Sequence, residues 1–350
     1  MSVRDDVTGR GHEDGPDSVS KRFQGGRIRI SIGVANEPYM DSPPEILLTN
    51  DDGIDAPGIR ALYDALSAVG SVTVVAPDRN RSAVGRALTY GRTGEDEEME
   101  SDSELEAESD ADDATVTSSA SGGFAVDIPD DSFTSPVPHA DHELGYAVDG
   151  TPCDCAIVGV NAIDPQPDVL VSGCNAGANL GAYVLSRSGT VSAAMEAAFL
   201  DVPSIAVSMD TLGYDRAGDT LESDGDLEPV DFERAAEITA SLVDGAPGTG
   251  LFDRIDYLNV NVPRPDRPVE NLAITRPTEV YEMDATIQDG RFRLTNRLWQ
   301  QMANRDIPDP SDTDRHALLE DDLSISPLVA PYELVDTEPV ERILADIVPV

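Results

Sequence analysis

A series of short apolar runs, separated by segments of helical length, restricts this chain to one class of fold. Most of the runs are continuous in Val, Ile, Leu and Ala, as in strands buried on both faces. Alternation of such strands with helices predicts an α/β fold, with a mostly parallel sheet between two helical layers. The clearest runs are EILLTN (45–50), SVTVVAP (71–77), DVLVSG (168–173), SIAVSM (204–209) and YLNVNV (257–262).

Helix-start signals fall between these runs. Pro57 stands at the first position of a helix, where proline is favoured, and Thr151 is an N-cap residue directly before Pro152. A third helix is expected from about Thr190. The C-terminal part adds an amphipathic helix, two strand-like segments and a final helix near 340–347. The first three are DFERAAEITASLV (231–243), LAITRP (272–277) and RFRLTN (291–296).

This organisation predicts one α/β domain over residues 45–330 and three segments of different character. Residues 1–44 are polar and interrupted by Gly and Pro, so we expect them to be disordered or, since Met40 stands just before the first strand, to precede the true start. Residues 94–123 form an acidic low-complexity insert, which we expect to be a solvated surface loop. Residues 331–350 are expected to form a C-terminal helix and tail.

The net charge of the chain limits the environment and the partners that we expect for it. The 350 residues include 67 acidic and 24 basic side chains, which gives a formal net charge of -43 at pH 7. We interpret this as the surface of a halophile's protein, because acidic side chains keep a protein hydrated in concentrated salt, where a Debye length of ~3 Å at 1 M screens their repulsion. A nucleic-acid polymer is disfavoured as a partner, since phosphate backbones need basic patches.

Cysteine usage and hydropathy indicate a cytoplasmic protein without a membrane partner. Cys153, Cys155 and Cys174 form no CxxC pair and no even-numbered set, which argues against a zinc site or a disulfide scaffold. No apolar stretch approaches the ~20 residues of a membrane span, and the N-terminus lacks the apolar core of a signal peptide.

Polar residues cluster where three predicted strands end. Asn50, Asp51 and Asp52 follow the first strand, and further oxygen donors occur in APDRNRSAVG (76–85) and SGCNAGANLG (172–181). Ligands of open α/β sheets bind at the carboxyl ends of the strands, and Mg²⁺ or Mn²⁺ favours carboxylate, carbonyl and hydroxyl oxygens. Asp51 and Asp52 are therefore candidate metal ligands. The alternative is an Asx-rich turn that closes the strand; an EF-hand is excluded by the oxygen spacing.

A phosphate site is expected beside the metal. Ser188, Gly189 and Thr190 precede an apolar helical segment, so backbone N–H groups and two hydroxyls meet at a helix N-terminus, where an anion is stabilised. Plain N-capping by Ser188 or Thr190 explains the same residues. The Gly-rich segment 172–181 is no Walker A sequence, because no GK[ST] follows. All four histidines lie outside these loops and are expected at the surface: His12, His139, His142 and His316.

Six segments between Ile46 and Pro263 occur in an order typical of one protein family. They are ILLTNDDGIDAPGI, VVAPDRNRSAVGRALT, GTPCDCAIVGVNAI, PDVLVSGCNAGANLG, SGTVSAAMEAAFLDVPSIAVS and YLNVNVP. The chain thereby resembles the SurE (survival protein E) family of metal-dependent phosphatases. SDTDRHALLEDDLSISPL (311–328) is similar to the C-terminal signature of that family.

The resemblance implies a Rossmann-like three-layer sandwich that acts as a 5'/3'-nucleotidase on nucleoside monophosphates, and in some members on polyphosphate. It implies one divalent cation per subunit, Mg²⁺ or Mn²⁺, held by Asp51, Asp52, Ser82 and Asn175. The positions that contact phosphate in the family correspond to Asn179, Ser188, Gly189 and Thr190. The family uses a C-terminal β-hairpin and helix extension for subunit exchange, which implies a homodimer or homotetramer.

Two departures from the family pattern stand out. AYVLSR (182–187) occupies a position where the family usually has one residue fewer and acids, as in DDVIY, so the rim of the phosphate site differs here. The acidic insert at 94–123 also lengthens the connection after the second loop.

The implied mechanism uses a metal-activated water for in-line attack on phosphorus. Asp51 or Asp52 could accept the proton of that water, while Asn179, Ser188 and Thr190 would stabilise the equatorial oxygens. Two alternatives are a nucleotide- or metal-binding sensor with little turnover, and a phosphatase of the haloacid-dehalogenase type that forms an aspartyl phosphate. A phosphatase of the haloacid-dehalogenase type has a D-x-D pattern and a lysine positioned on the phosphate. In this chain the two acids are adjacent, and the one lysine is Lys21.

Overall fold

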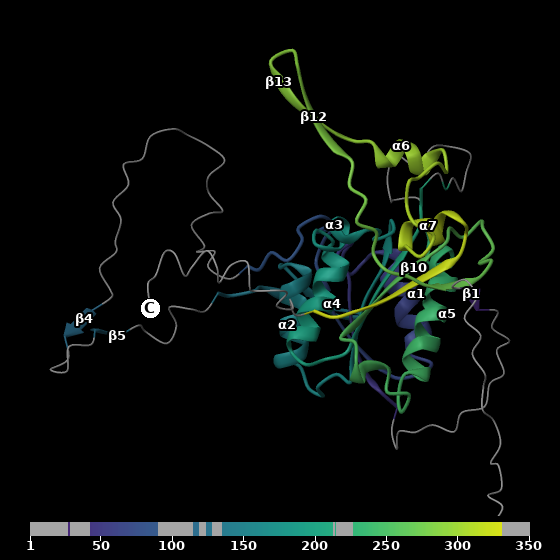
Figure 1. Cartoon of the computed structure of the whole chain (residues 1–350). Helices are drawn as coiled ribbons and strands as arrows, with labels where there is room; N and C mark the ends of the chain where they lie inside the picture. Colours follow the sequence, from purple (N-terminus) through teal and green to yellow (C-terminus); the bar gives the residue numbers. More distant parts are fainter. Residues whose placement is uncertain are drawn as a thin grey trace, which may run out of the picture.

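One ten-stranded sheet organises the described part of the chain (Figure 1). The computed structural model describes residues 27–28, 43–89, 115–118, 124–127, 135–212, 214 and 227–330. The strands of this sheet are β1 (Arg27–Ile28), β2 (Glu45–Thr49), β3 (Ser71–Pro77), β6 (His139–His142), β7 (Gly145–Val148), β8 (Val169–Ala176), β9 (Ser204–Met209), β10 (Tyr257–Val262), β11 (Leu272–Ile274) and β14 (Leu323–Leu328). Their spatial order is β1-β11-β14-β10-β9-β8-β2-β3-β7-β6.

The centre of the sheet is parallel, as the apolar runs predict. Strands β10, β9, β8, β2, β3 and β7 run parallel to one another, and Ile46 of β2 lies between Val169 of β8 and Val72 of β3. Every residue of β9 and β10 is buried, as expected for parallel strands that are covered on both faces. Antiparallel pairs occur toward the edges, where β14 pairs with β10, β1 with β11 and β6 with β7.

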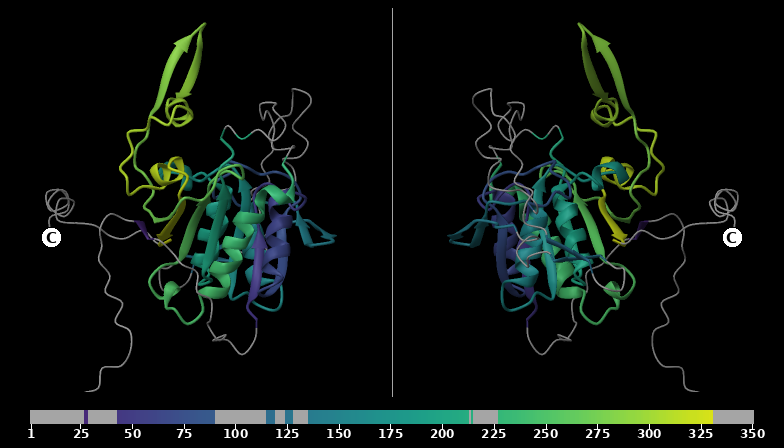
Figure 2. Two further views of the ribbon diagram at one scale, coloured as in Figure 1. Left: turned by 90° about the vertical axis from the view of Figure 1, so that its right-hand side faces the viewer. Right: turned by 90° about the vertical axis from the view of Figure 1, so that its left-hand side faces the viewer.

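Helices cover both faces of the sheet and complete three layers (Figure 2). On one face α1 (Pro57–Leu66) packs beside α5 (Pro229–Gly245), and on the other α2 (Pro152–Asn161) packs beside α4 (Gly189–Phe199). Contact between α1 and β8 is close, because a Cβ at Gly58 would lie 1.9 Å from the carbonyl oxygen of Cys174. The predicted cap of α2 is confirmed, since the Thr151 hydroxyl accepts a hydrogen bond of 3.1 Å from the Asp154 N–H.

The order of connection reverses between β2 and β8. From β2 the chain moves outward through β3 to β7, and from β8 it moves in the opposite direction through β9 to β10. Such a switch point opens a crevice at the carboxyl ends of the two central strands. Asn50, Asp51 and Asp52 follow β2 at this crevice, and β8 reaches it with Asn175.

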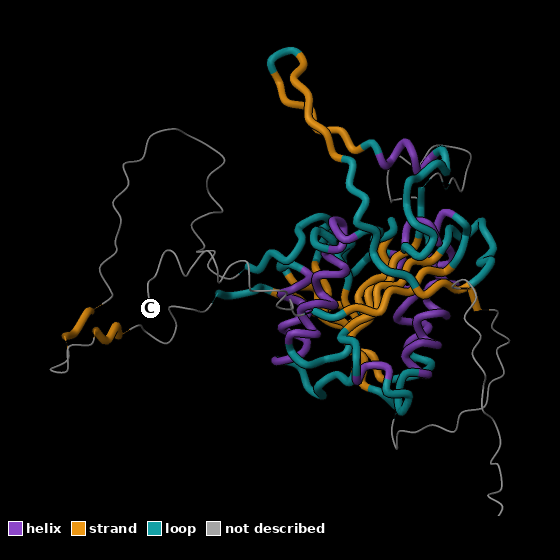
Figure 3. The backbone as a smooth tube through the Cα atoms, viewed as in Figure 1, coloured by secondary structure: helices purple, strands orange, loops and turns teal. Residues whose placement is uncertain are grey.

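The C-terminal part leaves the sandwich and returns to it. An antiparallel hairpin, β12 (Met283–Gln288) and β13 (Arg291–Asn296), projects from the body (Figure 3) and exposes 72% to 81% of three apolar side chains, Ile287, Phe292 and Leu294. The short helices are α3 (Ala182–Leu185), α6 (Leu298–Ala303) and α7 (Asp314–Leu319), with a 3-10 turn at Leu251–Asp253. The structure therefore contains the expected C-terminal hairpin and helix extension.

The structure describes only parts of the three segments that the sequence analysis separated from the α/β domain. In the segment 1–44, β1 is described and pairs with β11. In the acidic insert, β4 (Thr115–Ser118) is described and pairs with β5 (Phe124–Asp127), which follows the insert. The predicted C-terminal helix and tail at 331–350 lie outside the described residues. The proposed domain boundaries consequently stay predictions.

Candidate active site

A cavity of about 230 Å³ opens at the switch point of the sheet. Its walls come from the ends of β2 and β8, the loop after β3 and the start of α4. It is lined by Asp51, Asp52, Ser82, Ala83, Asn175, Ala176, Gly177, Asn179, Val184, Arg187, Ser188 and Thr190. All of the predicted site residues except Gly189 thus border one space. Gly189 lies directly behind it, because a Cβ there would be 2.6 Å from Oδ2 of Asp51.

Asp51 is the buried carboxylate of this cavity. Its residue surface is 5% exposed, and its Oδ1 accepts a 2.7 Å hydrogen bond from the Thr190 hydroxyl and another from the Asn175 amide. Burial raises the pKa of Asp51 above its ordinary value, while the hydrogen bonds from Thr190, Asn175 and the Gly189 backbone oppose this shift. No basic side chain among the described residues forms an ion pair with Asp51.

Asp52 is half-buried and joins the separate loops. Its Oδ1 accepts hydrogen bonds of 3.3 Å from the Ser82 hydroxyl and from the Asn80 amide. Its Oδ2 accepts one of 3.3 Å from the Ala176 N–H at the end of β8. Asp52 therefore brings Ser82 to the same point as Asn175, although the two lie far apart in sequence.

Asn50 has a different role from its two acidic neighbours. Its side chain donates to the Gly53 carbonyl at 2.8 Å and accepts from the Gly53 N–H at 3.2 Å. This is the Asx-type turn that the sequence offered as an alternative. The turn is made by Asn50 alone, so Asp51 and Asp52 keep their carboxylates for the cavity.

The donor set fits a hard divalent cation. Oδ1 of Asn175 is buried and accepts no hydrogen bond from the described residues, while Nδ2 of the same side chain donates to Asp51. A buried carbonyl oxygen without a donor has an unmet requirement that a cation can satisfy. The four predicted ligands, Asp51, Asp52, Ser82 and Asn175, all offer oxygen. Over the described ranges no group of three or more His, Cys, Asp or Glu side chains that could hold a metal ion is found, so the fit depends on this mixed set of carboxylate, hydroxyl and amide oxygens.

The cysteines are poor candidates for chemistry. Cys153, Cys155 and Cys174 are buried and free of disulfides. Burial raises the pKa of the Cys153 thiol to about 12 and raises the pKa of the other two thiols as well. The thiolate form that would bind a metal or attack a substrate is therefore strongly disfavoured.

The residues predicted to contact phosphate also have structural partners. Ser188 caps α4 by accepting a 3.1 Å hydrogen bond from the Val191 N–H, and Thr190 donates to Asp51. The Asn179 amide donates to the Ser208 hydroxyl at 2.7 Å, and its N–H donates to Oδ1 of Asn261 at 2.7 Å. These contacts fix where the residues stand around the cavity; their roles toward phosphate stay predictions.

Sequence reasoning missed three residues that shape this site. Arg187 lines the cavity and belongs to the AYVLSR departure, which was the available signal. Asn261 fixes the backbone of Asn179 and belongs to the YLNVNVP segment. Asp314 accepts a 2.7 Å hydrogen bond from the Gly181 N–H, so the C-terminal signature holds the Gly-rich loop in place.

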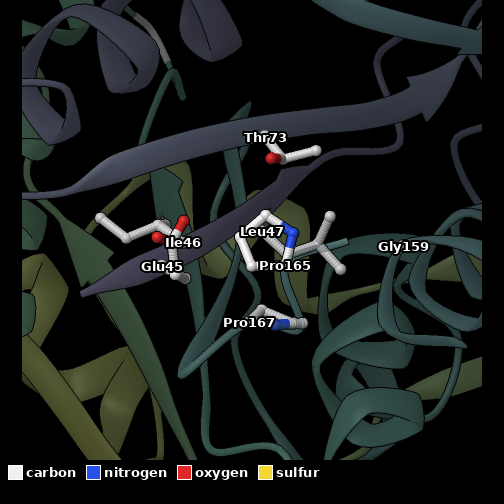
Figure 4. A pocket seen from close by; sticks show the side chains of 7 residues that line it. All are labelled: Glu45, Ile46, Leu47, Thr73, Gly159, Pro165 and Pro167. Carbon is white, nitrogen blue, oxygen red and sulfur yellow. The ribbon is translucent and has the colours of Figure 1, made fainter. Parts of the chain in front are cut away.

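Two other cavities are weaker candidates. One lies at the opposite, amino-terminal end of β2 and has space for about one water (Figure 4); its lining is Glu45, Ile46, Leu47, Thr73, Gly159, Pro165 and Pro167. The other has a volume of about 230 Å³ and lies beside α6. The three arginines in its lining already form ion pairs: Arg264 pairs with Asp266, and Arg267 and Arg305 both pair with Asp321.

Comparison with known proteins decides the family. The model of the family described as Survival protein SurE matches residues 46–284. The chain belongs to the SurE family. A 5'-nucleotidase SurE of Natronomonas pharaonis is 46% identical over 82% of this chain and 93% of its own length. The corresponding protein of Halobacterium salinarum is 46% identical over 83% of this chain and 92% of its own, and that of Haloarcula marismortui is 42% identical over 86% and 94%.

A solved SurE structure confirms the fold. The SurE protein from Aquifex aeolicus is 28% identical, with a TM-score of 0.59 over 87% of this chain and 99% of that chain. The relatives from halophilic archaea agree with the interpretation of the acidic surface. No helix in the described ranges has the length and apolar character needed to cross a membrane.

Proposed function

We propose that this SurE-family chain is a divalent-metal-dependent 5'-nucleotidase that hydrolyses nucleoside monophosphates to nucleoside and phosphate. The names of the archaeal relatives, 5'-nucleotidase SurE, support the substrate class. The observation that carries the proposal is the oxygen cluster at the switch point. There Asp51, Asp52 and Asn175 line one cavity beside the N-terminus of α4, and the side-chain carbonyl oxygen of Asn175 accepts no hydrogen bond from the described residues.

One cation per subunit, Mg²⁺ or Mn²⁺, would be held by Asp51, Asp52, Ser82 and Asn175. Such an ion, when bound, supplies a more acidic water and positive charge beside the phosphoryl oxygens. Both carboxylates line the cavity, but they differ in exposure, because Asp51 is buried whereas Asp52 is half-buried. Asp52 is accordingly the better placed of the two to accept the proton of the attacking water.

The other side of the cavity would hold the phosphate. The N-terminus of α4, which begins at Gly189, offers the partial positive charge of a helix start. Asn179 and Ser188 border the same space from the Gly-rich loop and the helix cap. Together these groups would orient the phosphate for attack and stabilise charge on its equatorial oxygens.

Release of inorganic phosphate tests the proposal. The protein is incubated with AMP or GMP in multimolar salt, with Mg²⁺ or Mn²⁺ added after chelation, and phosphate is quantified. A nucleotidase releases phosphate repeatedly, and only with the cation. Nucleotide binding without release would instead identify a sensor, and a phosphoenzyme trapped by acid quench would identify the aspartyl-phosphate route.

We further propose a homodimer or homotetramer and a cytoplasmic location. The support for assembly is the projecting β12–β13 hairpin, whose Ile287, Phe292 and Leu294 side chains are mostly exposed. Apolar groups gathered on one projecting element are costly in water and favour burial against a second subunit. Small-angle scattering in multimolar salt tests this, and a monomer at all concentrations would contradict it. The location rests on the sequence alone.

A further inference from the structure

Arg187 is the one basic side chain among the described residues that line the candidate active site. It is the last residue of AYVLSR and directly precedes Ser188, the cap of α4. The other charged residues of the lining are Asp51 and Asp52. A cation at this position therefore borders the same space as the two carboxylates, the space proposed for substrate.

Two tyrosines hold the Arg187 guanidinium without neutralising it. Its carbon lies 5.7 Å from the ring centre of Tyr183 and 6.0 Å from that of Tyr281, and Nη2 donates to the Tyr281 hydroxyl at 3.5 Å. The rings pack edge to face with centres 4.8 Å apart. Cation–π contacts of this kind restrain an arginine and leave its positive charge intact.

Arg187 lacks the paired acid that two nearby arginines have. Acidic residues outnumber basic ones by 67 to 24, and nearby arginines are paired: Arg81 with Asp149, and Arg86 with Glu196. Within the described ranges, Arg187 forms no ion pair. Its guanidinium therefore keeps hydrogen-bonding capacity for an anion that enters the cavity.

Charge balance shows why the site would require such a group. Two ionised carboxylates and one divalent cation sum to zero, so a phosphate monoester dianion would enter a site with no net positive charge. The chain as a whole carries a net charge of -43, which repels the dianion. Salt screens that repulsion beyond a few ångströms but equally screens distant attraction, so the compensating cation must lie in direct contact.

We propose that Arg187 contacts the phosphate of the substrate in this enzyme; the inference rests on the proposed nucleotidase function. A planar guanidinium can bind two phosphate oxygens with a fork of parallel N–H···O hydrogen bonds, which a lysine cannot reproduce. Tyr183 and Tyr281 orient the guanidinium of Arg187. Because Arg187 directly precedes Ser188, its N–H donors add to those of the α4 N-terminus. The AYVLSR departure from the family pattern thus supplies a phosphate contact of this chain's own.

Kinetics of Arg187→Gln test the proposal. With AMP and Mn²⁺ in multimolar salt, we expect kcat/KM to fall about 10- to 100-fold, the effect of losing a hydrogen bond to a charged group. Competitive inhibition by inorganic phosphate should weaken by a similar factor, whereas inhibition by adenosine should not change. Arg187→Lys keeps the charge without the fork and should recover part of the loss.

Arg86→Gln is the matched control. Arg86 also combines an aromatic contact, to Phe199 at 4.8 Å, with a polar partner, Glu196, but it does not line the cavity. We expect its kinetics to match the wild type.

The outcomes separate this inference from the proposed function. If the wild type releases no phosphate from AMP, the nucleotidase proposal fails. If the wild type is active and Arg187→Gln, folded by circular dichroism, keeps both its kcat/KM and its inhibition by phosphate, the Arg187 proposal is overturned. It is equally overturned if inhibition by adenosine weakens while that by phosphate does not, because Arg187 would then contact the nucleoside.

Discussion

Asp51 and Asp314 are both buried carboxylates near the Gly-rich loop, yet their surroundings are opposite in kind. Asp314 accepts hydrogen bonds from the backbone N–H groups of Gly181, at 2.7 Å, and Thr278, at 3.0 Å. The next residue, Arg315, is buried and paired with Asp309 at 3.0 Å. Asp51 has hydroxyl and amide partners on side chains, no ion pair within the described ranges, and beside it the unsatisfied oxygen of Asn175.

The difference separates a structural carboxylate from a site that requires a ligand. A buried charge is tolerated when backbone donors and a cation compensate it, and the chain itself supplies both around Asp314. Around Asp51 the described part of the chain supplies further oxygen atoms and no cation that pairs with it, so a cation bound from solution must compensate the negative charge of Asp51. Burial raises the pKa of both groups, which shows that a shifted pKa alone does not mark the active site.

The largest expected effect is the loss of activity when either carboxylate of the cavity is removed. Asp51→Asn and Asp52→Asn should each lower kcat/KM for AMP by about 10³-fold or more, because an undercoordinated cation makes its water less acidic. Melting curves without added metal should stay near those of the wild type. Activity retained in saturating Mn²⁺ by a folded variant would contradict the metal assignment.

The second effect is on stability rather than on chemistry. Asp314→Ala leaves the buried N–H groups of Gly181 and Thr278 without an acceptor, and we expect the free energy of unfolding to fall by about 2–4 kcal/mol. Urea titration in constant multimolar salt measures this. Asp312→Ala is the control, because it removes a neighbouring carboxylate whose pair with Arg276 is exposed and should contribute little. Equal stability of the two variants would remove the structural role of Asp314.

The contrast also shows what the sequence could predict. The parallel sheet was predictable, because strands buried on both faces are mostly apolar; β10, for example, carries Leu and Val beside its two buried asparagines, Asn259 and Asn261. The metal-binding candidates were predictable too, since carboxyl ends of parallel strands meet at one edge, which brings Asp51 and Asn175 together.

Other features depend on contacts that local sequence does not encode. Asp314 and Gly181 are 133 positions apart in the sequence, and no local pattern of apolar residues predicts the hydrogen bond between them. Arg187 was visible only as part of an unexplained departure, because its significance comes from two tyrosines 98 positions apart, Tyr183 and Tyr281. Asn50 was grouped with its acidic neighbours although its amide closes the turn with Gly53.

Metal addition should stabilise the protein through Asp51 and not through Asp314. At a free Mn²⁺ concentration of 100 times its Kd, mass action adds about 2.7 kcal/mol to the free energy of unfolding. Thermal melts with and without Mn²⁺ should therefore differ for the wild type and for Asp314→Ala, but not for Asp51→Asn. An undiminished shift in Asp51→Asn would place the cation elsewhere.

The smallest expected effect is the contribution of Asp314 to the pH dependence of stability. Burial raises the pKa of Asp314 above its ordinary 3.8, so in the folded state the group holds its proton more tightly than in the unfolded chain. The stability that it contributes is fully present below the unfolded pKa and is lost as the pH rises through the folded pKa. Asp314→Ala removes this contribution, so the difference in unfolding free energy between wild type and variant should narrow from pH 3.5 to pH 7, by about 1.4 kcal/mol for each unit by which the pKa is raised. Urea titrations of the wild type and of Asp314→Ala at several pH values in constant salt test this. A difference that widened with pH would mean that the N–H donors of Gly181 and Thr278 outweigh burial, and that Asp314 is held as an anion.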